Sequence, residues 1–225
     1  MNTLKSIIKG NIKENELMSK HTYYGIGGPA DAYITPQDKN DLCTILRYAD
    51  ENSIPAYFIG SGSNLLVSDE GIKGLVLSPG KAFRQLQFNN CHVFAESGVM
   101  LGRIVRESIK RNLSGLESLI GVPGTLGGAL VMNAGAFGGE ISNYLQSVDI
   151  MNMKGEIVSY TPSDLNFSYR FSSFKKNEFI ISANFILSKE QARVIKKKKD
   201  NANKGRKMNQ PLKFRSAGSV FKNTK

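Results

Sequence analysis

The sequence lacks the features that mark several specialised classes of protein. It contains no tryptophan and only two cysteines, Cys43 and Cys91, among 225 residues. These cysteines have no CxxC spacing, and together with His21 and His92 they form no zinc-ligand pattern, which argues against a disulfide scaffold and a metal centre. Such cysteine usage fits a reducing cytoplasm. Hydrophobic residues make up 40% of the chain and charged residues 22%, an ordinary globular composition.

The sequence also lacks a long apolar segment. Its N-terminus becomes charged within a few residues, unlike a secretory signal peptide. Residues 118–139 are free of charge but contain seven glycines, one proline and one asparagine. That is too much backbone freedom for a lipid-facing helix. We expect instead a backbone that packs closely around something.

Net charge is absent from the first 188 residues, which carry 17 basic and 17 acidic side chains. The remaining 37 residues carry 13 basic and two acidic side chains and therefore hold the whole excess of +11. A neutral body has no basic stripe for a nucleic-acid backbone. The basic segment leaves an RNA-binding or membrane-binding tail open as an alternative, although a run such as 196–199 is more often a solvated helix face.

The hydrophobic pattern predicts two successive units of helices and strands. The first unit has a helix that Thr35 caps, with Pro36 at the first helical position. Residues 161–164 resemble another capped helix start, and a polar, basic helix is expected after Lys189. The predicted strands are 33–34, 56–59, 75–77, 91–95, 148–151, 156–159 and 179–187. The predicted apolar helix faces are Leu42, Ile45, Leu46 and Ala49, and Leu101, Ile104, Val105 and Ile109.

Two glycine-rich loops are the main chemical signal. Residues 60–66 follow a predicted strand and alternate glycine with serine, and residues 121–128 contain four glycines. Glycine lets backbone N–H groups turn toward an anion, and serine hydroxyls add donors. The first loop lacks the lysine of a P-loop and the third glycine of the dinucleotide fingerprint, so neither a Walker site nor an ordinary Rossmann site fits. The pair indicates a large cofactor held by main-chain contacts, with a structural crossover as the alternative.

Two side chains outside these loops are candidates for chemistry. Arg170 lies in a segment rich in aromatic and hydroxyl side chains, where a guanidinium can bind a carboxylate with two hydrogen bonds. Ser219 can donate a proton, although a lone serine is usually structural. The sequence has no GxSxG motif for a hydrolase triad.

A series of motifs along nearly the whole chain resembles one known family, the UDP-N-acetylenolpyruvoylglucosamine reductases. No single motif is specific, but their order is. They are His21-Thr22 with 25–31, and then 60–69, 114–117, 121–128, 132–140, Tyr169-Arg170, 210–212 and 216–223.

The resemblance implies an α+β chain with a PCMH-type FAD-binding fold. Two small α/β subdomains, 22–77 and 78–188, would follow a lead-in at 1–21 and precede an incomplete α+β substrate domain at 189–225. The residues that the resemblance assigns to FAD are Gly60, Ser61, Gly62, Ser63, Asn64, Leu65, Gly124, Thr125, Gly127, Gly128, Asn133, Ala134 and Gly135.

The implied reaction reduces FAD with NADPH and then reduces the enolpyruvyl ether of UDP-N-acetylglucosamine to UDP-N-acetylmuramate. This step belongs to peptidoglycan synthesis, and so to cell-wall biogenesis, cell shape and cell division in the cytoplasm. Hydride attack builds charge on the substrate carboxyl group, which a nearby cation stabilises. Arg170 matches the family's residue for that role, and Ser219 matches its proton donor. Asn223 and Lys207 match positions that meet the substrate diphosphate.

We expect a monomer that uses this UDP-sugar and NADPH, with no metal, nucleic acid or membrane. The family carries a catalytic glutamate several dozen residues beyond the Ser219 motif, whereas this sequence ends at Lys225 and has Thr224 where the family usually has proline. We therefore expect FAD binding to survive better than catalysis. We also expect the segment after Lys189 to lack packing partners and to be poorly ordered. An FAD-binding fragment without catalysis is the main alternative.

Overall fold

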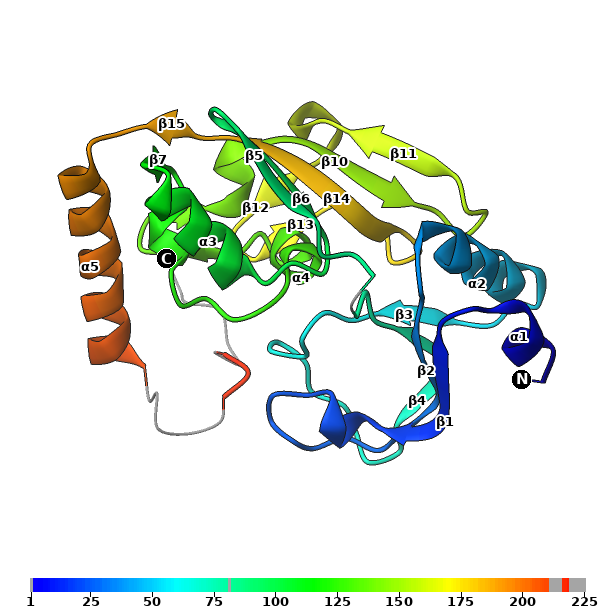
Figure 1. Ribbon diagram of the computed structural model, residues 1–225. Coiled ribbons are helices and arrows are strands. Elements are labelled where there is room, and N and C mark those ends of the chain that lie inside the picture. Colours follow the sequence, from blue (N-terminus) through cyan, green and yellow to red (C-terminus); the bar gives the residue numbers. More distant parts are fainter. Residues whose placement is uncertain (1, 81, 211–215, 219–225) are drawn as a thin grey trace.

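The computed structural model of the protein describes residues 2–80, 82–210 and 216–218 (Figure 1). The elements are α1 (Asn2–Ile7), β1 (Asn11–Leu17), η1 (Met18–Lys20), β2 (Pro29–Thr35), α2 (Lys39–Glu51), β3 (Ala56–Phe58), β4 (Ile72–Leu77), β5 (Leu86–Asn89), β6 (His92–Glu96), α3 (Leu101–Lys110), β7 (Leu113–Ser114), η2 (Glu117–Leu119), α4 (Leu126–Val131), β8 (Gly135–Ala136), β9 (Gly139–Glu140), η3 (Ile141–Tyr144), β10 (Leu145–Met151), β11 (Ile157–Tyr160), η4 (Pro162–Asp164), β12 (Phe167–Ser168), β13 (Phe171–Ser172), β14 (Phe179–Ile186), β15 (Ser188–Lys189) and α5 (Ala192–Asn209).

The first sheet has four strands in the order β1-β2-β4-β3. Strands β2, β4 and β3 are parallel, and β1 pairs with β2 in the antiparallel direction. Because β2 and β3 run the same way, the chain needs a crossover between them, and α2 provides it. The predicted apolar face of α2 is confirmed, since all four of its residues are fully buried in the core beside β2 and β4.

The predicted start of α2 is wrong. The helix begins at Lys39, and its N-cap is Asp38, which accepts a hydrogen bond of 2.8 Å from the backbone N–H of Asp41. Thr35 cannot serve as the cap because it is the last residue of β2, where it pairs with Asn11. The strand therefore extends further than the apolar pattern indicates.

The second sheet has five antiparallel strands in the order β11-β10-β14-β6-β5. The predicted hairpin β10–β11 and the long strand β14 are confirmed. Residues 161–164 form a capping box, but only the 3₁₀ turn η4 follows, because Leu165 returns to an extended conformation. The predicted apolar face of α3 packs against this sheet together with α4.

The two sheets share part of one core. Met151, Phe179 and Ile181 of the second sheet pack among the buried side chains of the first, and the rings of Phe58 and Phe179 meet edge to face at 4.9 Å. On the surface, Arg47 of α2 donates a 2.8 Å hydrogen bond to the carbonyl of Lys154 in the β10–β11 turn. These contacts fix the position of one sheet relative to the other.

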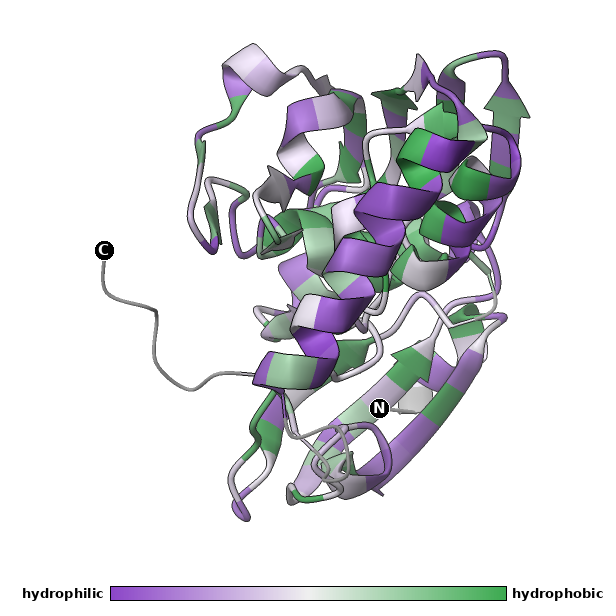
Figure 2. Cartoon of the chain, turned by 90° about the vertical axis from the view of Figure 1, so that its left-hand side faces the viewer, coloured by the Kyte–Doolittle hydropathy of each residue, from purple (hydrophilic) through white to green (hydrophobic). Residues whose placement is uncertain are grey.

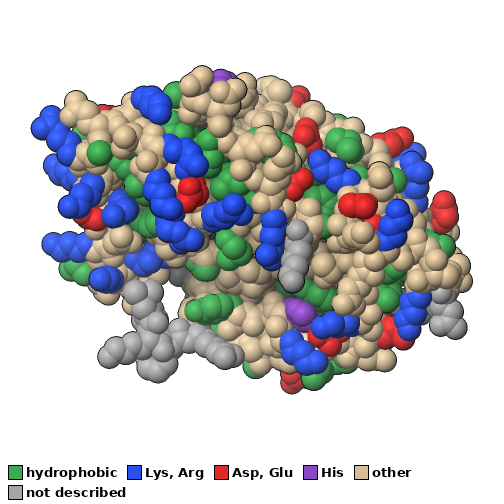
Figure 3. All heavy atoms as spheres, viewed as in Figure 1, with side chains coloured by type: hydrophobic (Ala, Val, Ile, Leu, Met, Phe, Trp, Pro, Cys, Tyr) green, Lys and Arg blue, Asp and Glu red, His purple; other side chains and the backbone are tan. Residues whose placement is uncertain are grey.

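The basic segment after Lys189 forms α5, which runs along one side of the molecule (Figures 1 and 2). Ile195 and Ala202 are buried on the same helix face, and Lys198 Nζ donates a 2.9 Å hydrogen bond to Ser114 Oγ. The expectation that this segment lacks packing partners is therefore wrong for α5. Its other face is hydrophilic, and Lys and Arg side chains gather on that side of the molecule (Figures 2 and 3). Among the described residues, no helix has the length and apolar character to cross a membrane.

Candidate functional site

The two glycine-rich loops lie against each other. A Cβ atom on Gly60 would overlap Thr125 Oγ1, and a Cβ atom on Gly124 would lie 3.2 Å from Ser63 Oγ. The first loop leaves the carboxyl end of β3, and the second leads into α4. Two segments that are far apart in sequence therefore form one surface, and glycine permits their close approach.

Backbone hydrogen bonds fix the second loop. The carbonyl of Gly124 accepts from Leu101 N at 3.0 Å, and the N–H groups of Leu126 and Gly127 donate to Val99 and Ser97 at 2.8 and 2.9 Å. The segment that follows β6 thus carries the loop on its surface. Gly124 has a φ of 126°, a conformation that side chains with a Cβ rarely adopt.

The chemistry of the two loops suits a phosphate-bearing ligand. The first loop contributes the exposed hydroxyl of Ser61 and the half-buried hydroxyl of Ser63. Thr125 Oγ1 and Ser97 Oγ are buried and have no hydrogen-bond partner among the described residues. Because buried hydroxyls are normally paired, unpaired donors beside two close-packed glycine loops fit a ligand rich in acceptor oxygens. These residues therefore fit the FAD that the family resemblance implies.

Asn133, Gly135 and Arg170 form a second part of the site. Asn133 is fully buried, and its Nδ2 donates to Glu140 Oε2 at 2.8 Å and to the carbonyl of Ser168 at 3.0 Å. Both partners are acceptors, so the orientation of the amide is fixed and Oδ1 has no donor among the described residues. A Cβ atom on Gly135 would lie 3.3 Å from Arg170 Nη1. The candidate cofactor segment and the candidate catalytic arginine are thus neighbours.

Arg170 lies at the turn between β12 and β13, half-buried, with a φ of 56°. Its guanidinium carbon is 5.2 Å from the centre of the Tyr169 ring. Among the described residues, no carboxylate lies within ion-pair distance of Arg170. The guanidinium can therefore receive an anionic group of a ligand.

Three candidates remain, of which the structure describes one. Lys207 is exposed on α5, beside a shallow hollow of 420 Å³ that Lys204 also lines. Ser219 and Asn223 lie outside the described residues. The nearby segment 216–218 does reach the first glycine loop, because a Cβ atom on Gly218 would lie 3.7 Å from Asn64 Oδ1.

Sequence reasoning gave no role to two residues of this site. Glu140 is the first charged residue after the charge-free run 118–139, and this position in the sequence is a signal that could have singled it out. Ser97 is buried behind the second loop, and its sequence position gives no signal of that place.

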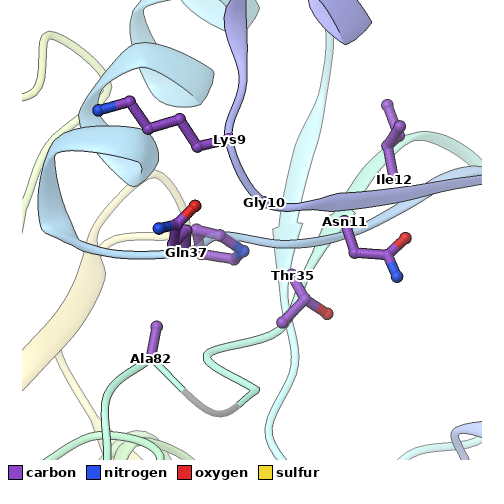
Figure 4. Close-up of a pocket in the computed structure, with 8 residues that line it drawn as sticks. Lys9, Gly10, Asn11, Ile12, Thr35, Gln37 and Ala82 are labelled. Atoms are coloured by element: carbon purple, nitrogen blue, oxygen red, sulfur yellow. The ribbon is translucent and has the colours of Figure 1, made fainter.

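A larger open pocket, of 720 Å³, lies at the carboxyl end of β2 (Figure 4). Residues 9–12, 35–37 and 82 line it, and Lys9 is its charged member. Among the predicted site residues that the structure describes, none lines this pocket, and it is separate from the two glycine loops.

Comparison with known proteins gives consistent matches. A family model described as an FAD binding domain matches residues 30–161. The UDP-N-acetylenolpyruvoylglucosamine reductase of Clostridium novyi (strain NT) is 40% identical over 221 residues, which are 97% of this chain and 72% of the relative. The enzyme of the same name from Clostridioides difficile (strain 630) is 40% identical over 223 residues, 99% of this chain and 73% of the relative.

Solved structures give the same pattern. The crystal structure of UDP-N-acetylenolpyruvylglucosamine reductase from Thermus caldophilus superposes with a TM-score of 0.84 at 32% identity, covering 96% of this chain and 76% of that one. A solvent-stable cholesterol oxidase has a TM-score of 0.63 at 14% identity, covering 81% of this chain and 39% of that one, which shows a shared fold alone. The predicted FAD-binding fold of the α+β class is confirmed.

Proposed function

The chain belongs to the UDP-N-acetylenolpyruvoylglucosamine reductase family and is an oxidoreductase with an FAD-binding domain. From this membership we propose that it reduces the enolpyruvyl ether of UDP-N-acetylglucosamine to UDP-N-acetylmuramate, with FAD as its bound cofactor and NADPH as the reductant. The proposed place of this reaction is peptidoglycan precursor synthesis in the cytoplasm.

The observation that carries the proposal is the contact between the two glycine-rich loops. They join backbone and hydroxyl donors from the two segments into one surface, and neither loop carries a charged side chain of its own. Such a cradle of main-chain and hydroxyl donors suits a dinucleotide pyrophosphate. FAD, when bound, supplies the hydride transfer between NADPH and the substrate. The protein's part is to hold that cofactor, to orient the substrate and to manage charge and protons on it.

Arg170 is the proposed electrostatic catalyst. Reduction of the enolpyruvyl group places negative charge on the substrate carboxylate and the adjoining carbon, and a guanidinium within reach lowers the energy of that charge. The closeness of its guanidinium to Gly135 supports this role. Ser219 is the proposed proton donor to the carbon that becomes saturated, because an enolate is basic enough to take a proton from a hydroxyl.

Lys207 and Asn223 are the proposed ligands of the substrate diphosphate. We also propose the division of the chain at residues 22, 78 and 189. The second sheet falls entirely within 78–188, and the first takes β1 from the lead-in. The proposed assembly is a monomer without nucleic-acid, membrane or metal partners.

The test is NADPH oxidation by the purified, FAD-loaded chain of 225 residues, with and without UDP-N-acetylenolpyruvoylglucosamine. The proposal expects consumption that depends on the substrate and yields UDP-N-acetylmuramate. Bound flavin without substrate-dependent consumption would favour an FAD-binding fragment without catalysis. A chain that binds no FAD would refute the proposal.

A further inference from the structure

Glu16 of β1 holds a negative charge that no step of the proposed reaction uses. Its side chain is 10% exposed, and it accepts hydrogen bonds from His21 Nε2 at 3.1 Å, Lys20 Nζ at 3.2 Å and Lys13 Nζ at 3.4 Å. The bond from His21 is the largest cause that lowers the pKa of Glu16. Burial opposes it, and with the two lysines the pKa falls to about 2. Glu16 is therefore an anion across the physiological range.

The ring of His21 is held on two sides. Its Nε2 edge meets the carboxylate of Glu16, and its face stacks on the ring of Tyr33 from β2, with centres 3.8 Å apart and planes inclined by 18°. One directional contact and one planar contact together leave the ring a single orientation. The backbone that carries His21 is fixed with it.

That backbone supports the first glycine loop. A Cβ atom on Gly62 would overlap the carbonyl oxygen of His21, so the two segments are in tight contact. Tyr23 N donates to the carbonyl of Gly62 at 3.0 Å, and Thr22 Oγ1 closes the same turn on the carbonyl of Ile26 at 2.7 Å. Residues 21–23 therefore support the loop 60–65 from below at Gly62.

We propose that Glu16 is a positioning residue for the candidate cofactor site, and that it acts through His21 to hold residues 21–23 against the loop 60–65. The inference rests on the proposed function only in taking FAD as the ligand of that loop. The link from Glu16 to Gly62 is a property of the chain alone. Loss of the carboxylate charge changes no residue of the loop but lets residues 21–23 move more freely beneath it. FAD affinity therefore falls while the fold persists.

The test compares Glu16→Gln with Glu14→Gln in the full chain. Glu14 is a matched control, because it lies two residues away on the same strand in an exposed pair with Lys5. FAD affinity is measured from flavin fluorescence well below the unfolding temperature. We expect the Kd of Glu16→Gln to rise roughly three- to tenfold, as for one weakened charged hydrogen bond, and that of Glu14→Gln to stay within about twofold.

Hydrogen exchange of the FAD-free protein measures directly how firmly residues 21–23 and the loop 60–65 are held. Glu16→Gln should speed exchange in peptides covering 18–28 and 58–67, and Glu14→Gln should not. Faster exchange with an unchanged Kd would overturn the role in cofactor binding. Unchanged exchange would overturn the link from Glu16 through His21 to Gly62. A parent chain that binds no FAD would overturn the proposed function, and the exchange rates alone would then decide whether the link exists.

A double-mutant cycle tests whether Glu16 acts through His21. If it does, Glu16→Gln combined with His21→Gln should weaken FAD binding no more than His21→Gln alone. Additive losses would contradict the proposed path. Should Glu16→Gln fail to fold, His21→Gln against the parent chain provides the same comparison of Kd and exchange.

Discussion

Arg170 combines a proposed catalytic charge with an unfavourable backbone conformation, and substitutions can separate the effects of the two. Its φ of 56° lies in the left-handed region, which costs a residue with a Cβ atom about 1–2 kcal/mol and costs glycine little. Alanine keeps this cost and glycine removes it, while glycine loses more freedom on folding, by about 0.4–1 kcal/mol. We therefore expect Arg170→Gly to be more stable than Arg170→Ala by about 0.5–1 kcal/mol.

For a chain of this length, such a difference raises the melting temperature of the glycine variant by about 1–4 °C over that of the alanine variant. Both variants lose the guanidinium. Under the proposed function, both should reduce the enolpyruvyl substrate about 10²- to 10³-fold more slowly than the parent chain.

The assay is thermal unfolding of the FAD-free proteins, followed by substrate-dependent NADPH oxidation of the loaded ones. Equal melting temperatures, or a more stable alanine variant, would refute the strain argument. Activity retained in both variants would refute the catalytic role of Arg170, whatever their stability.

Three further predictions concern other parts of the chain. Gly60→Ala would place a Cβ atom against Thr125 Oγ1, so FAD titration should give a Kd at least about tenfold higher than that of the parent chain. The control is Gly102→Ala in α3, where only the flexible end of Arg106 borders the new atom, and this variant should bind FAD normally. Because folding lowers the pKa of Glu16 from 4.5 to about 2, its contribution is complete above the unfolded value and is lost as the pH falls through that interval. Urea unfolding of Glu16→Gln should therefore depend less on pH there, and an unchanged pH profile would contradict the ion-pair cluster. Ile195→Ala removes a fully buried side chain from α5 and should lower the free energy of unfolding by about 2–4 kcal/mol, measured by denaturant titration; a loss below about 0.5 kcal/mol would mean that α5 does not pack as described.

The parts of the fold that the sequence predicts are those with a strong periodic pattern. The apolar faces of α2 and α3 and the hairpin β10–β11 are where the pattern places them. Strand β1 was not predicted, because it is a charged edge strand whose side chains are mostly exposed. Its partner β2 sets its conformation, and no local pattern carries that information.

The site was predicted in composition but not in geometry. The glycines of both loops are visible in the sequence, whereas the contact between Gly60 and Thr125 depends on how the two sheets share a core. The packing of α5 is a similar case. A run of lysines resembles a solvated face, and only Ile195 and Ala202 on the opposite face bring the helix onto the body. Tertiary contacts that join distant segments thus decide what composition leaves open.

The most direct test of the account is a titration of FAD into the purified chain, followed by flavin fluorescence and absorbance. The account predicts saturable binding of one FAD per chain with a perturbed flavin spectrum, and a much weaker Kd for Gly60→Ala than for Gly102→Ala. Flavin signals that stay those of free FAD throughout the titration would contradict the claim that the two glycine-rich loops form a cofactor site.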